Sequence, residues 1–561
     1  MTDFPDITLT SGFETQTFLA LRIFRKNYIQ NLQKAWNSRS SPKFANNLPI
    51  EHCFMARSHD ATWSSKLIEW VLSNKQLVLF RVVTFVWLRT WFVPDEYFQS
   101  IEISYGQVFG KGETTWEWDP NNALRSYLHP LLYMSPYYIL KLLKIDSGVL
   151  IRAIPVVIHF LFTLISDFAI QKAYRKLLKY ADAEKNALIL YQLNWFILYS
   201  LPRSLANTIE MLLGIYAAGF YPKRSFIPLV LLAGLIRPTS AIIWAPLVLY
   251  QLYLGGFRIL KYFLTVSLSL LTISTFVDYL FYGRFTFPVL NFFLFNIYQG
   301  GSAQFGVNSA FYYIAGLYSL APIEMTVLSL IVLTSIRQVH QHVKWMISHE
   351  PQIVIYAILS LSYIIVHSLI PHKEHRFLLP VIPFIIPVVS SIYSRLRPGS
   401  SLLIIALINI PLFMFFGGLH QIGHLSVVNE LRNGIKATNG GIISYLTPCY
   451  SIPQYAYLHP DGLKWTITQL DCISVVREGD RDTTPQDIFF QNTTAAISSH
   501  WNKYVGDAKY IVMYDKLLSE LDQTSIGSKL RTLYNIKSYF HTIFPVGENS
   551  GKYLVLLTKK N

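Results

Sequence analysis

Two adjacent acidic residues that follow an apolar segment are the first candidates for chemistry. Asp95 and Glu96 come directly after Pro94. Because Pro suits the first turn of a helix, we expect a helix over residues 95 to 108, with Asp95, Gln99 and Glu102 on one face. Neighbouring helical residues point about 100° apart, so we expect one principal base and one supporting group rather than two carboxylates on the same substrate atom.

Two interpretations of these carboxylates remain open. Acidic residues after Pro are ordinary partners of the helix dipole in a first turn, which requires no function. An ionisable group at a membrane boundary, packed among Trp and Tyr, is costly and is therefore a functional candidate. The loop that follows has no apolar period and supplies polar and aromatic neighbours, namely Trp116, Glu117, Trp118 and Arg125.

A second group of polar residues, His372, Lys373, Glu374 and Arg376, lies between two apolar segments. Its cations fall on the predicted non-cytosolic side, where Lys and Arg are scarce, so they need an anionic partner. Phosphate suits them, because Lys offers a point charge and Arg a bidentate fork. A basic turn that touches lipid headgroups is an equally good interpretation of the spacing.

The composition predicts the elements that position these residues. Of the 561 residues, 52% are hydrophobic and 14% charged, whereas soluble domains have about 25% charged residues. Several apolar runs approach the roughly 18 to 20 residues that cross a bilayer, which predicts a polytopic membrane protein. The net charge of +15 comes mainly from short loops, so membrane orientation explains it without a nucleic-acid partner.

We expect about 11 transmembrane helices, at residues 76–92, 148–170, 187–202, 206–221, 226–239, 240–255, 261–281, 310–336, 352–370, 377–394 and 401–420. With a cytosolic N-terminus, the basic loops 172–179, 222–225, 256–261, 337–344 and 395–398 all fall in the cytosol, as the positive-inside rule requires. We divide 226–255 at Pro238 because Pro interrupts helical hydrogen bonding. A single kinked span there would place His372 across the membrane from Asp95.

The predicted organisation has three parts. Residues 1–74 form a cytosolic tail without a signal-peptide pattern, and residues 75–423 form the transmembrane module, with a first luminal loop at 93–147. Residues 424–561 contain alternating patches at 510–514 and 553–557, which predict a small luminal α/β domain. In that domain Asn492 is an N-glycosylation acceptor, and Cys449 and Cys472 either pair or remain two free thiols.

The motif H-K-E-H-R-F at residues 372–377 resembles the H-K-E-x-R-F signature of dolichol-phosphate-mannose-dependent mannosyltransferases with the GT-C membrane fold. The first loop, with P-D-E-Y-F-Q-S-I-E, T-W-E-W and R-S-Y-L-H-P, is similar to the branch that adds the third mannose of glycosylphosphatidylinositol (GPI) in α-1,2 linkage. The resemblance continues through residues 203–210, 236–239, 278–292 and 447–453 and covers about residues 80 to 460. Two departures are a long N-terminal tail and the absence of an expected His-Pro-Trp near Asn308.

The resemblance implies a multi-pass enzyme of the endoplasmic reticulum membrane with a luminal active site. Its donor would be dolichol-phosphate-mannose and its acceptor a two-mannose GPI glycolipid, joined by one inverting displacement. Asp95 would be the base with Glu96 beside it, and His372, Lys373, Arg376 and Arg237 would bind the donor phosphate. Further substrate contacts are expected from Tyr97, Gln99, Trp116, Glu117, Trp118, Arg125, Arg203, Asn207, Glu210 and Glu374. No D-x-D pattern lies near the site, so we predict no cofactor and metal independence.

Other functions remain open. The enzyme that adds the fourth mannose of GPI carries a related first loop, and a mannosyltransferase of lipid-linked oligosaccharide is a further alternative. Charged residues within spans and broken helices also suit a polytopic transporter, although no internal repeat of spans is visible. A purely structural subunit is the last alternative.

Overall fold

The computed structural model describes residues 63–560 except residues 439, 461–463, 473–475, 479–480 and 546. The chain divides into two compact units, Met1–Val86 and Trp87–Asn561. In the first unit, α3 (Trp63–Ser73) leads into α4 (Lys75–Trp87), and between them the Asn74 side chain donates to the carbonyl oxygen of Trp70. Most of the predicted cytosolic tail, 1–74, lies outside the described residues.

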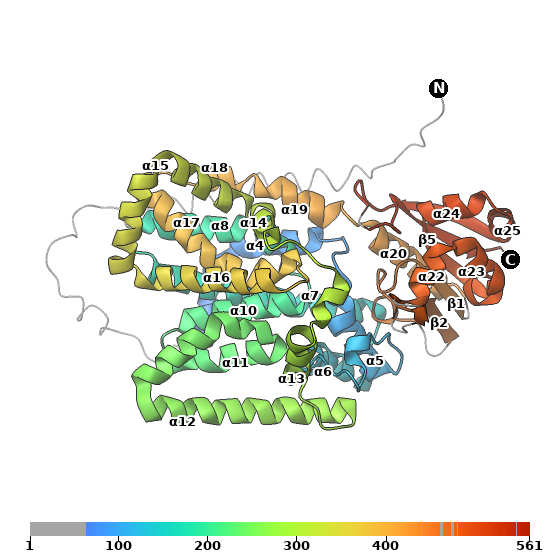
Figure 1. Ribbon diagram of the computed structural model, residues 1–561, viewed down its shortest axis with the longest axis horizontal. Coiled ribbons are helices and arrows are strands. Elements are labelled where there is room, and N and C mark those ends of the chain that lie inside the picture. Colours follow the sequence, from blue (N-terminus) through green and yellow to red (C-terminus); the bar gives the residue numbers. More distant parts are fainter. Residues whose placement is uncertain are drawn as a thin grey trace. The chain divides into compact units, whose positions relative to one another are not determined.

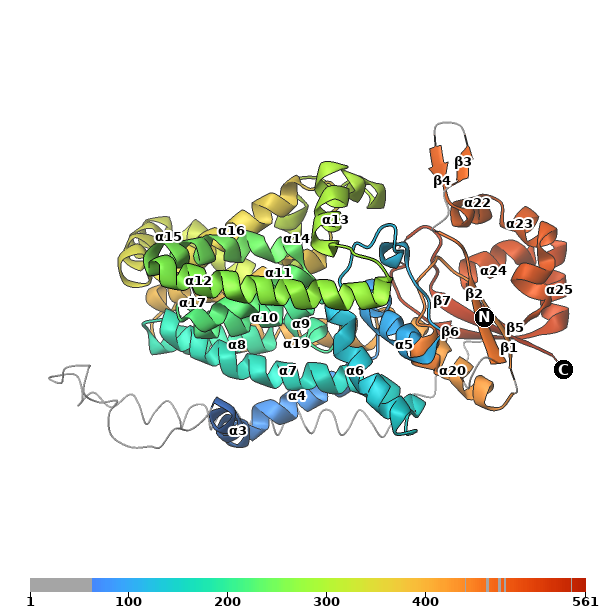
Figure 2. The same ribbon diagram turned by 90° about the horizontal axis from the view of Figure 1, so that it is seen from below.

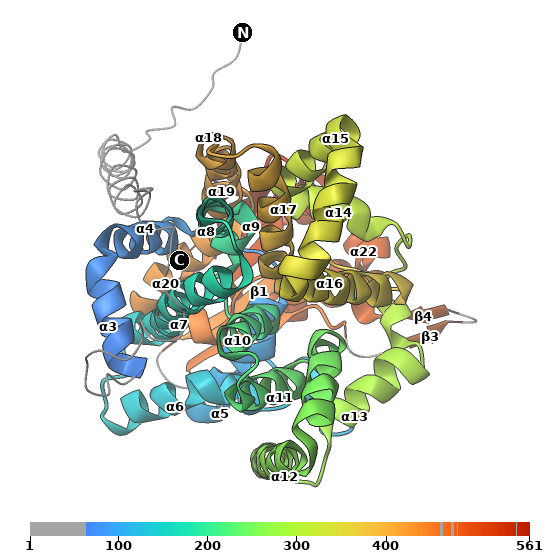
Figure 3. The ribbon, with the colours of Figure 1, turned by 90° about the vertical axis from the view of Figure 1, so that its left-hand side faces the viewer.

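The first part of the second unit is helical (Figure 1). Its helices are α5 (Glu102–Phe109), α6 (Leu128–Leu142), α7 (Gly148–Leu177), α8 (Ala181–Leu193), α9 (Trp195–Ser200), α10 (Ala206–Phe220), α11 (Ile227–Ile236), α12 (Ala241–Tyr282), α13 (Pro288–Phe293), α14 (Tyr312–Leu320), α15 (Pro322–His349), α16 (Pro351–Leu369), α17 (Ile382–Leu396), α18 (Leu403–Ala406) and α19 (Asn409–Gly418). Seen end-on in Figure 3, α10 lies at the centre with the other helices around it, and most of its residues are buried. An apolar helix that is buried all round is typical of the core of a large bundle.

Six helical segments of the described chain are long and apolar enough to cross a membrane. They are Gly148–Leu177, Pro238–Tyr282, Pro322–His349, Pro351–Leu369, His375–Leu396 and Leu403–Lys436. The expectation of a polytopic α-helical membrane protein agrees with these segments. The expected number of about 11 spans stays a prediction, since shorter apolar helices such as Arg224–Ile236 accompany the six.

Several expected loops are helical in the structure. Residues 172–177 belong to α7, and residues 337–344 belong to α15, which continues to His349 because Gln, Lys and His are compatible with a helix and the next Pro is Pro351. The span end expected at residue 336 nevertheless lies beside a break, since Ser335 has non-helical backbone angles (φ −143°, ψ 35°). The break expected after residue 255 is confirmed at Gly256, where a φ of 52° and a ψ of −149° interrupt α12 and separate two helices, although residues 257–261 are themselves helical. The single span expected at 310–336 is divided by Ala321 into α14 and α15.

Beyond α19 the chain forms a mixed α/β region. Its five-stranded sheet has the order β2-β1-β5-β7-β6, with β1 parallel to β2 and β5, and β7 antiparallel to β5 and β6. The elements are α20 (Gly423–Lys436), β1 (Gly441–Leu446), α21 (Tyr455–Leu458), β2 (Trp465–Gln469), β3 (Val476–Glu478), β4 (Arg481–Thr483), α22 (Pro485–Gln491), α23 (Thr493–Ser499), β5 (Ala508–Tyr514), α24 (Asp515–Asp522), α25 (Ser525–Leu533), β6 (Tyr534–Phe540) and β7 (Tyr553–Lys559). The hairpin of β3 and β4 projects from this region in Figure 2.

The two patches with alternating residues become neighbouring central strands. In β5 and β7, Ile511 pairs with Leu557 and Met513 with Val555, and all four side chains are buried. Cys449 and Cys472 form a disulfide, which resolves the two alternatives in favour of pairing. Asn492 is exposed, and its side-chain oxygen accepts from the backbone N–H of Ala495 at the start of α23.

The first loop is tied to this α/β region by hydrogen bonds. The carboxylate of Glu102 accepts from the backbone N–H groups of Tyr455 and Ala456 at 2.8 and 3.0 Å. Lys111 donates to the carbonyl oxygen of Trp465. Buried side chains of α5, α6, α20 and the sheet share one hydrophobic core, so the sheet helps to hold the loop that carries Asp95.

Candidate active site

Asp95 lies at the beginning of a helical segment whose first turn is a π-helix, Tyr97–Ile101, and which continues as α5. The carbonyl oxygen of Pro94 accepts from the backbone N–H groups of Tyr97 and Phe98, both at 3.0 Å. The helix expected over residues 95 to 108 is thus confirmed, but its face is different. A π-turn contains more residues than an α-turn, so it rotates Glu102 away from Asp95 and Gln99 and toward α21.

The two polar clusters of the sequence meet at Arg376. Its Nη1 donates to Asp95 Oδ2 at 2.5 Å across 281 residues of chain. On its other side, Nε and Nη2 donate to the two oxygens of Glu374 at 2.7 and 2.6 Å, a bidentate pair. His372 Nε2 lies 3.1 Å from Glu374 Oε1. Burial favours a neutral Glu374, but the charge of Arg376 and the hydrogen bonds of Arg376 and His372 hold its pKa well below the usual range.

This contact has a topological consequence. Residues that touch lie on the same side of a bilayer, so the chain crosses the membrane an even number of times between Asp95 and Arg376. α11 ends at Ile236, and a short 3₁₀ turn, Pro238–Ser240, separates it from α12. The helix break expected at Pro238 is thus confirmed, and the number of crossings stays a prediction.

Lys373 lies differently from its neighbours in the turn. Its Nζ donates to the carbonyl oxygens of Asn308, Ile370 and Pro371, and its backbone N–H donates to the side-chain oxygen of Asn308. The residue is buried and does not line the cavity beside Arg376. Asn308, in the segment where an expected motif is missing, thus helps to hold the turn.

A cavity of about 370 Å³ opens beside the pair of Asp95 and Arg376. It contains a further hydrogen-bonded chain, in which Gln99 and Arg125 both donate to the carboxylate of Glu117. Trp116 forms one aromatic wall and stacks on Phe305, with ring centroids 5.7 Å apart. The expected site residues that line the cavity are Asp95, Gln99, Trp116, Glu117, Arg125, Arg237, His372, Glu374 and Arg376.

Arg237 extends into this cavity from the break between α11 and α12. Its Nε donates to Glu210 Oε2 at 2.9 Å, and its guanidinium lies over the ring of Phe377. Among the described residues, its two Nη groups have no hydrogen-bond acceptor in the protein, so a guanidinium edge is available to a ligand. Glu210 itself is buried behind Arg237 and does not line the cavity.

Several expected site residues lie behind the cavity wall. Glu96 forms an ion pair with Arg203 at 2.6 Å, in which the Arg203 side chain is 1% exposed. Tyr97 stacks on Trp91, and Trp118 is buried against Tyr127. Asn207 is fully buried, and its side-chain amide has no partner in the described part of the chain. These residues can position the site, but they do not line the cavity.

The match to a known family extends over most of the chain and is not limited to the site residues. Residues 74–459 match the family model described as the Alg9-like mannosyltransferase family. This chain belongs to the Alg9-like mannosyltransferase family. The cavity described above is therefore the candidate active site of a membrane-embedded glycosyltransferase.

Relatives of this Alg9-like mannosyltransferase cover most of its length. The human protein named GPI alpha-1,2-mannosyltransferase 3 is 28% identical over 499 residues, which are 84% of this chain and 85% of the relative. The Candida albicans protein named GPI mannosyltransferase 3 is 29% identical over 504 residues, 84% of this chain and 96% of the relative.

Solved structures give weaker likenesses. ArnT from Cupriavidus metallidurans, bound to undecaprenyl phosphate, has a TM-score of 0.47 and 13% identity, with 87% of this chain and 98% of that chain covered. The Archaeoglobus fulgidus oligosaccharyltransferase has a TM-score of 0.43 and 13% identity, with 85% and 73% covered. Likenesses of this size carry no weight for the site of the Alg9-like mannosyltransferase.

The sequence interpretation missed the aromatic wall of the cavity. Phe292, Phe295 and Phe305 come from α13 and the turns after it, and Tyr450 comes from the disulfide-bonded loop. The density of Phe in residues 281–295 was the available signal. Within an apolar chain it is hard to distinguish from lipid-facing sequence, because both require the same residue types.

The arrangement can bind an anion and accept a proton within one cavity. Arg237, Arg376 and His372 supply donors, Asp95 supplies a carboxylate, and aromatic rings cover the remaining surface. Aromatic faces and a few directed polar groups are typical of a small-molecule site.

Proposed function

We propose that this chain transfers the third mannose, in α-1,2 linkage, from dolichol-phosphate-mannose to a two-mannose GPI precursor at the membrane of the endoplasmic reticulum. Family membership supports mannosyl transfer, and the names of the relatives support the GPI acceptor and the α-1,2 linkage. The observation that carries the mechanism is the meeting of Asp95 and Arg376 at one cavity that Arg237 also lines.

In the proposed reaction, Asp95 takes the proton of the acceptor 2-hydroxyl as its oxygen attacks the anomeric carbon of mannose. The bond from that carbon to the phosphate oxygen breaks in the same step, and the β linkage of the donor becomes an α linkage. The leaving dolichyl phosphate gains negative charge, so cations beside it stabilise the transition state more than the ground state. Arg376 and Arg237 are the cations placed for this role, and His372 is a further hydrogen-bond donor.

Arg376 also connects donor binding to the base. In the described chain it bonds Asp95 on one side and Glu374 on the other. When the phosphate of dolichol-phosphate-mannose accepts a hydrogen bond from Arg376 Nη1, it competes with Asp95 for that N–H group. The carboxylate oxygen of Asp95 is then free to take the proton of the hydroxyl group on the GPI precursor. Glu374 keeps the guanidinium in place during this exchange.

The predicted absence of a metal requirement belongs to the same proposal, because guanidinium groups neutralise the leaving phosphate. Transfer by the purified enzyme is expected to persist in excess EDTA. Loss of transfer in EDTA, restored by a divalent cation, would contradict this part of the proposal.

The decisive experiment identifies the lipid that accumulates when the protein is removed. Cells that lack it should accumulate a two-mannose GPI precursor, and purified protein should extend that precursor by one mannose from radiolabelled dolichol-phosphate-mannose. A three-mannose precursor would instead indicate the fourth-mannose step, and short dolichol-linked oligosaccharides would indicate N-glycan assembly.

A further inference from the structure

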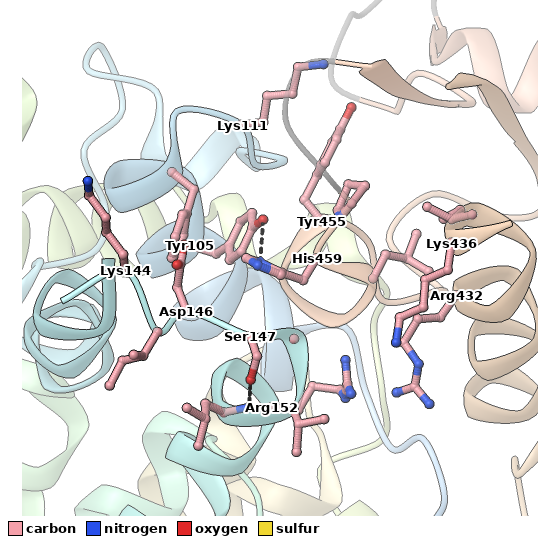
Figure 4. Close-up of a pocket in the computed structure, with 18 residues that line it drawn as sticks. Tyr105, Lys111, Lys144, Asp146, Ser147, Arg152, Arg432, Lys436, Tyr455 and His459 are labelled. Atoms are coloured by element: carbon pink, nitrogen blue, oxygen red, sulfur yellow. Dashed lines mark hydrogen bonds between the residues drawn. The ribbon is translucent and has the colours of Figure 1, made fainter. Parts of the chain in front are cut away.

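A second and larger cavity, of about 960 Å³, lies where the first loop and the start of α7 meet α20 and α21 (Figure 4). It shares no lining residue with the candidate active site. Arg432 and Lys436 reach it from α20, whereas Ser147 and Arg152 reach it from the start of α7. Nothing in the proposed reaction uses these residues.

The lining of this basic cavity is strongly unbalanced in charge. Five cationic side chains, Lys111, Lys144, Arg152, Arg432 and Lys436, accompany one carboxylate, Asp146. Arg152 Nη1 donates to a neutral carbonyl oxygen, that of Tyr457. Among the described residues, Arg152, Arg432 and Lys436 form no ion pair. Like charges in one concave site raise the local concentration of anions, so an anionic ligand would relieve their repulsion.

The cavity also borders exposed apolar surface. It lies at the first residues of α7, a segment long and apolar enough to cross the membrane. Ile145, Val149 and Leu150 line it, and they are 50%, 66% and 40% exposed. On α6 the neighbouring Leu142 is 69% exposed. Cations beside exposed apolar residues at the end of a membrane helix suit a lipid, with its phosphate among the cations and its chains along the apolar surface.

We propose that this basic cavity binds the phosphate of an anionic lipid headgroup. Two lipids carry that chemistry: an anionic phospholipid of the bilayer, and the GPI acceptor itself through its inositol phosphate, the second of which rests on the proposed function. Gln99 lines the active site and Tyr105 lines the basic cavity, six residues later in one helical segment. At 1.5 Å per residue the two sites are offset by roughly 9 Å along this helix, so a lipid held in one can present its glycan to the other.

The test uses the double variant Arg432→Gln and Lys436→Gln. Both side chains lie on the outer part of α20, half-exposed and exposed, so the substitution removes charge without opening the core. The matched control is Lys529→Gln with Lys552→Gln, which removes the same charge from exposed positions outside the cavity.

The first measurement is lipid retention by the purified full-length protein in detergent, followed by native mass spectrometry with phosphatidylinositol and phosphatidylcholine as probes. Wild type and control should prefer phosphatidylinositol. The double variant should bind it roughly tenfold more weakly, with phosphatidylcholine unchanged. Equal retention of phosphatidylinositol by wild type and double variant overturns the proposal. This readout requires no mannosyl transfer, so it is independent of the proposed function.

The second measurement separates the two lipid sources, using the two-mannose GPI acceptor and a soluble analogue that lacks the phosphate. If the acceptor is the ligand, the double variant should raise KM for the GPI acceptor about tenfold at unchanged kcat, and leave the analogue unaffected. If phosphatidylinositol retention falls but both KM values are unchanged, the cavity binds a bilayer phospholipid.

Discussion

Asp95 and Glu96 are neighbours in the chain, but their surroundings differ. Asp95 lines the cavity, and its partner Arg376 lines the same cavity. Glu96 does not line the cavity and is bonded to Arg203, which is buried behind the wall. The sequence left open which carboxylate is the base, and this difference in surroundings supports the proposal that it is Asp95.

We predict that Asp95→Asn lowers turnover by about 10²- to 10⁴-fold with little change in donor affinity, because the substitution keeps the shape and removes the proton acceptor. The measurement is kcat and KM for dolichol-phosphate-mannose with purified protein. Glu96→Gln is the matched comparison. It leaves the buried charge of Arg203 without its partner, which costs about 3 to 5 kcal/mol, so it should reduce the amount of folded protein more than the turnover per molecule. The opposite pattern in the two variants would assign the base to Glu96.

Lys373 and Arg237 differ in whether their charged groups are available to a ligand. The ammonium of Lys373 is occupied by three backbone carbonyl oxygens, whereas the Nη groups of Arg237 lie at the cavity. Lys373→Met should therefore lower the thermal midpoint of the protein and change the donor KM of the folded enzyme less than about threefold.

For Arg237→Lys we predict a donor KM about 10- to 100-fold higher at nearly unchanged thermal stability. The variant retains a cation for Glu210 but loses the fork, and hydrogen bonds to charged groups contribute about 1.5 to 3 kcal/mol. Kinetics of both variants at matched protein level provide the check. A large KM effect in Lys373→Met without a stability effect would place Lys373 on the phosphate after all.

At the scale of elements, Glu102 joins α5 to the start of α21. Burial raises the pKa of Glu102 to about 7, although backbone hydrogen bonds from Ala456, Tyr455 and Glu113 favour its ionised form. Between about pH 4.5 and 7 the folded protein then holds a proton that the unfolded chain releases, so the free energy of unfolding falls as pH rises. The full loss is about 3 kcal/mol and is complete above pH 7.

Glu102→Gln should remove this pH dependence, because the amide keeps an acceptor oxygen and does not titrate. Thermal midpoints in detergent at several values between pH 4.5 and 8 measure it, with the exposed Glu520→Gln as control. Parallel curves for wild type and Glu102→Gln would show that Glu102 is not the titrating group.

The same helix shows how far the sequence could go. Pro94 and the acidic residues after it correctly indicated a helix start. The expectation that Asp95 and Gln99 share one face of this helix is also correct, because both line the cavity. The π-turn left no pattern in the residue types, so the predicted position of Glu102 on that face was wrong. Likewise, the polar residues 337–344 suggested a loop but are helical, and the end of the apolar segment is marked instead by the break at Ser335.

The charged part of the site was predictable because charge in an apolar chain is conspicuous. Arg376, Glu374 and Asp95 stand out in sequence, and the expected proximity of the two polar clusters is found in the contact between Asp95 and Arg376. The direction of Lys373 was not predictable, because it depends on carbonyl oxygens that any residue supplies. The partner of Arg203 was not predictable either. Its place in the segment 203–210 did not indicate that it pairs with Glu96 behind the cavity wall.

At the scale of the whole molecule, the cavity, the disulfide and Asn492 must share one side of the membrane. The first loop carries Asp95 and is hydrogen-bonded to the α/β region that contains Cys449, Cys472 and Asn492. A disulfide persists in an oxidising compartment, which favours the lumen for this region and hence for the cavity. The basic segments 172–179, 222–225 and 395–398, which lie at or beside helix ends, favour the cytosol for the opposite end of the helices.

We therefore predict that a protease added to sealed microsomes spares the α/β region and that detergent exposes it to cleavage. The exposed Asn492 should carry a glycan removable by endoglycosidase, and Asn492→Gln should abolish that mobility shift, with the exposed Asn502→Gln, which lies outside any acceptor motif, as control. Because Glu102 and Lys111 bind this region to the first loop, protection of one implies protection of the other. Cleavage of the α/β region in intact microsomes would place Asp95 and Arg376 in the cytosol, and the donor and acceptor would then have to be reached from that side.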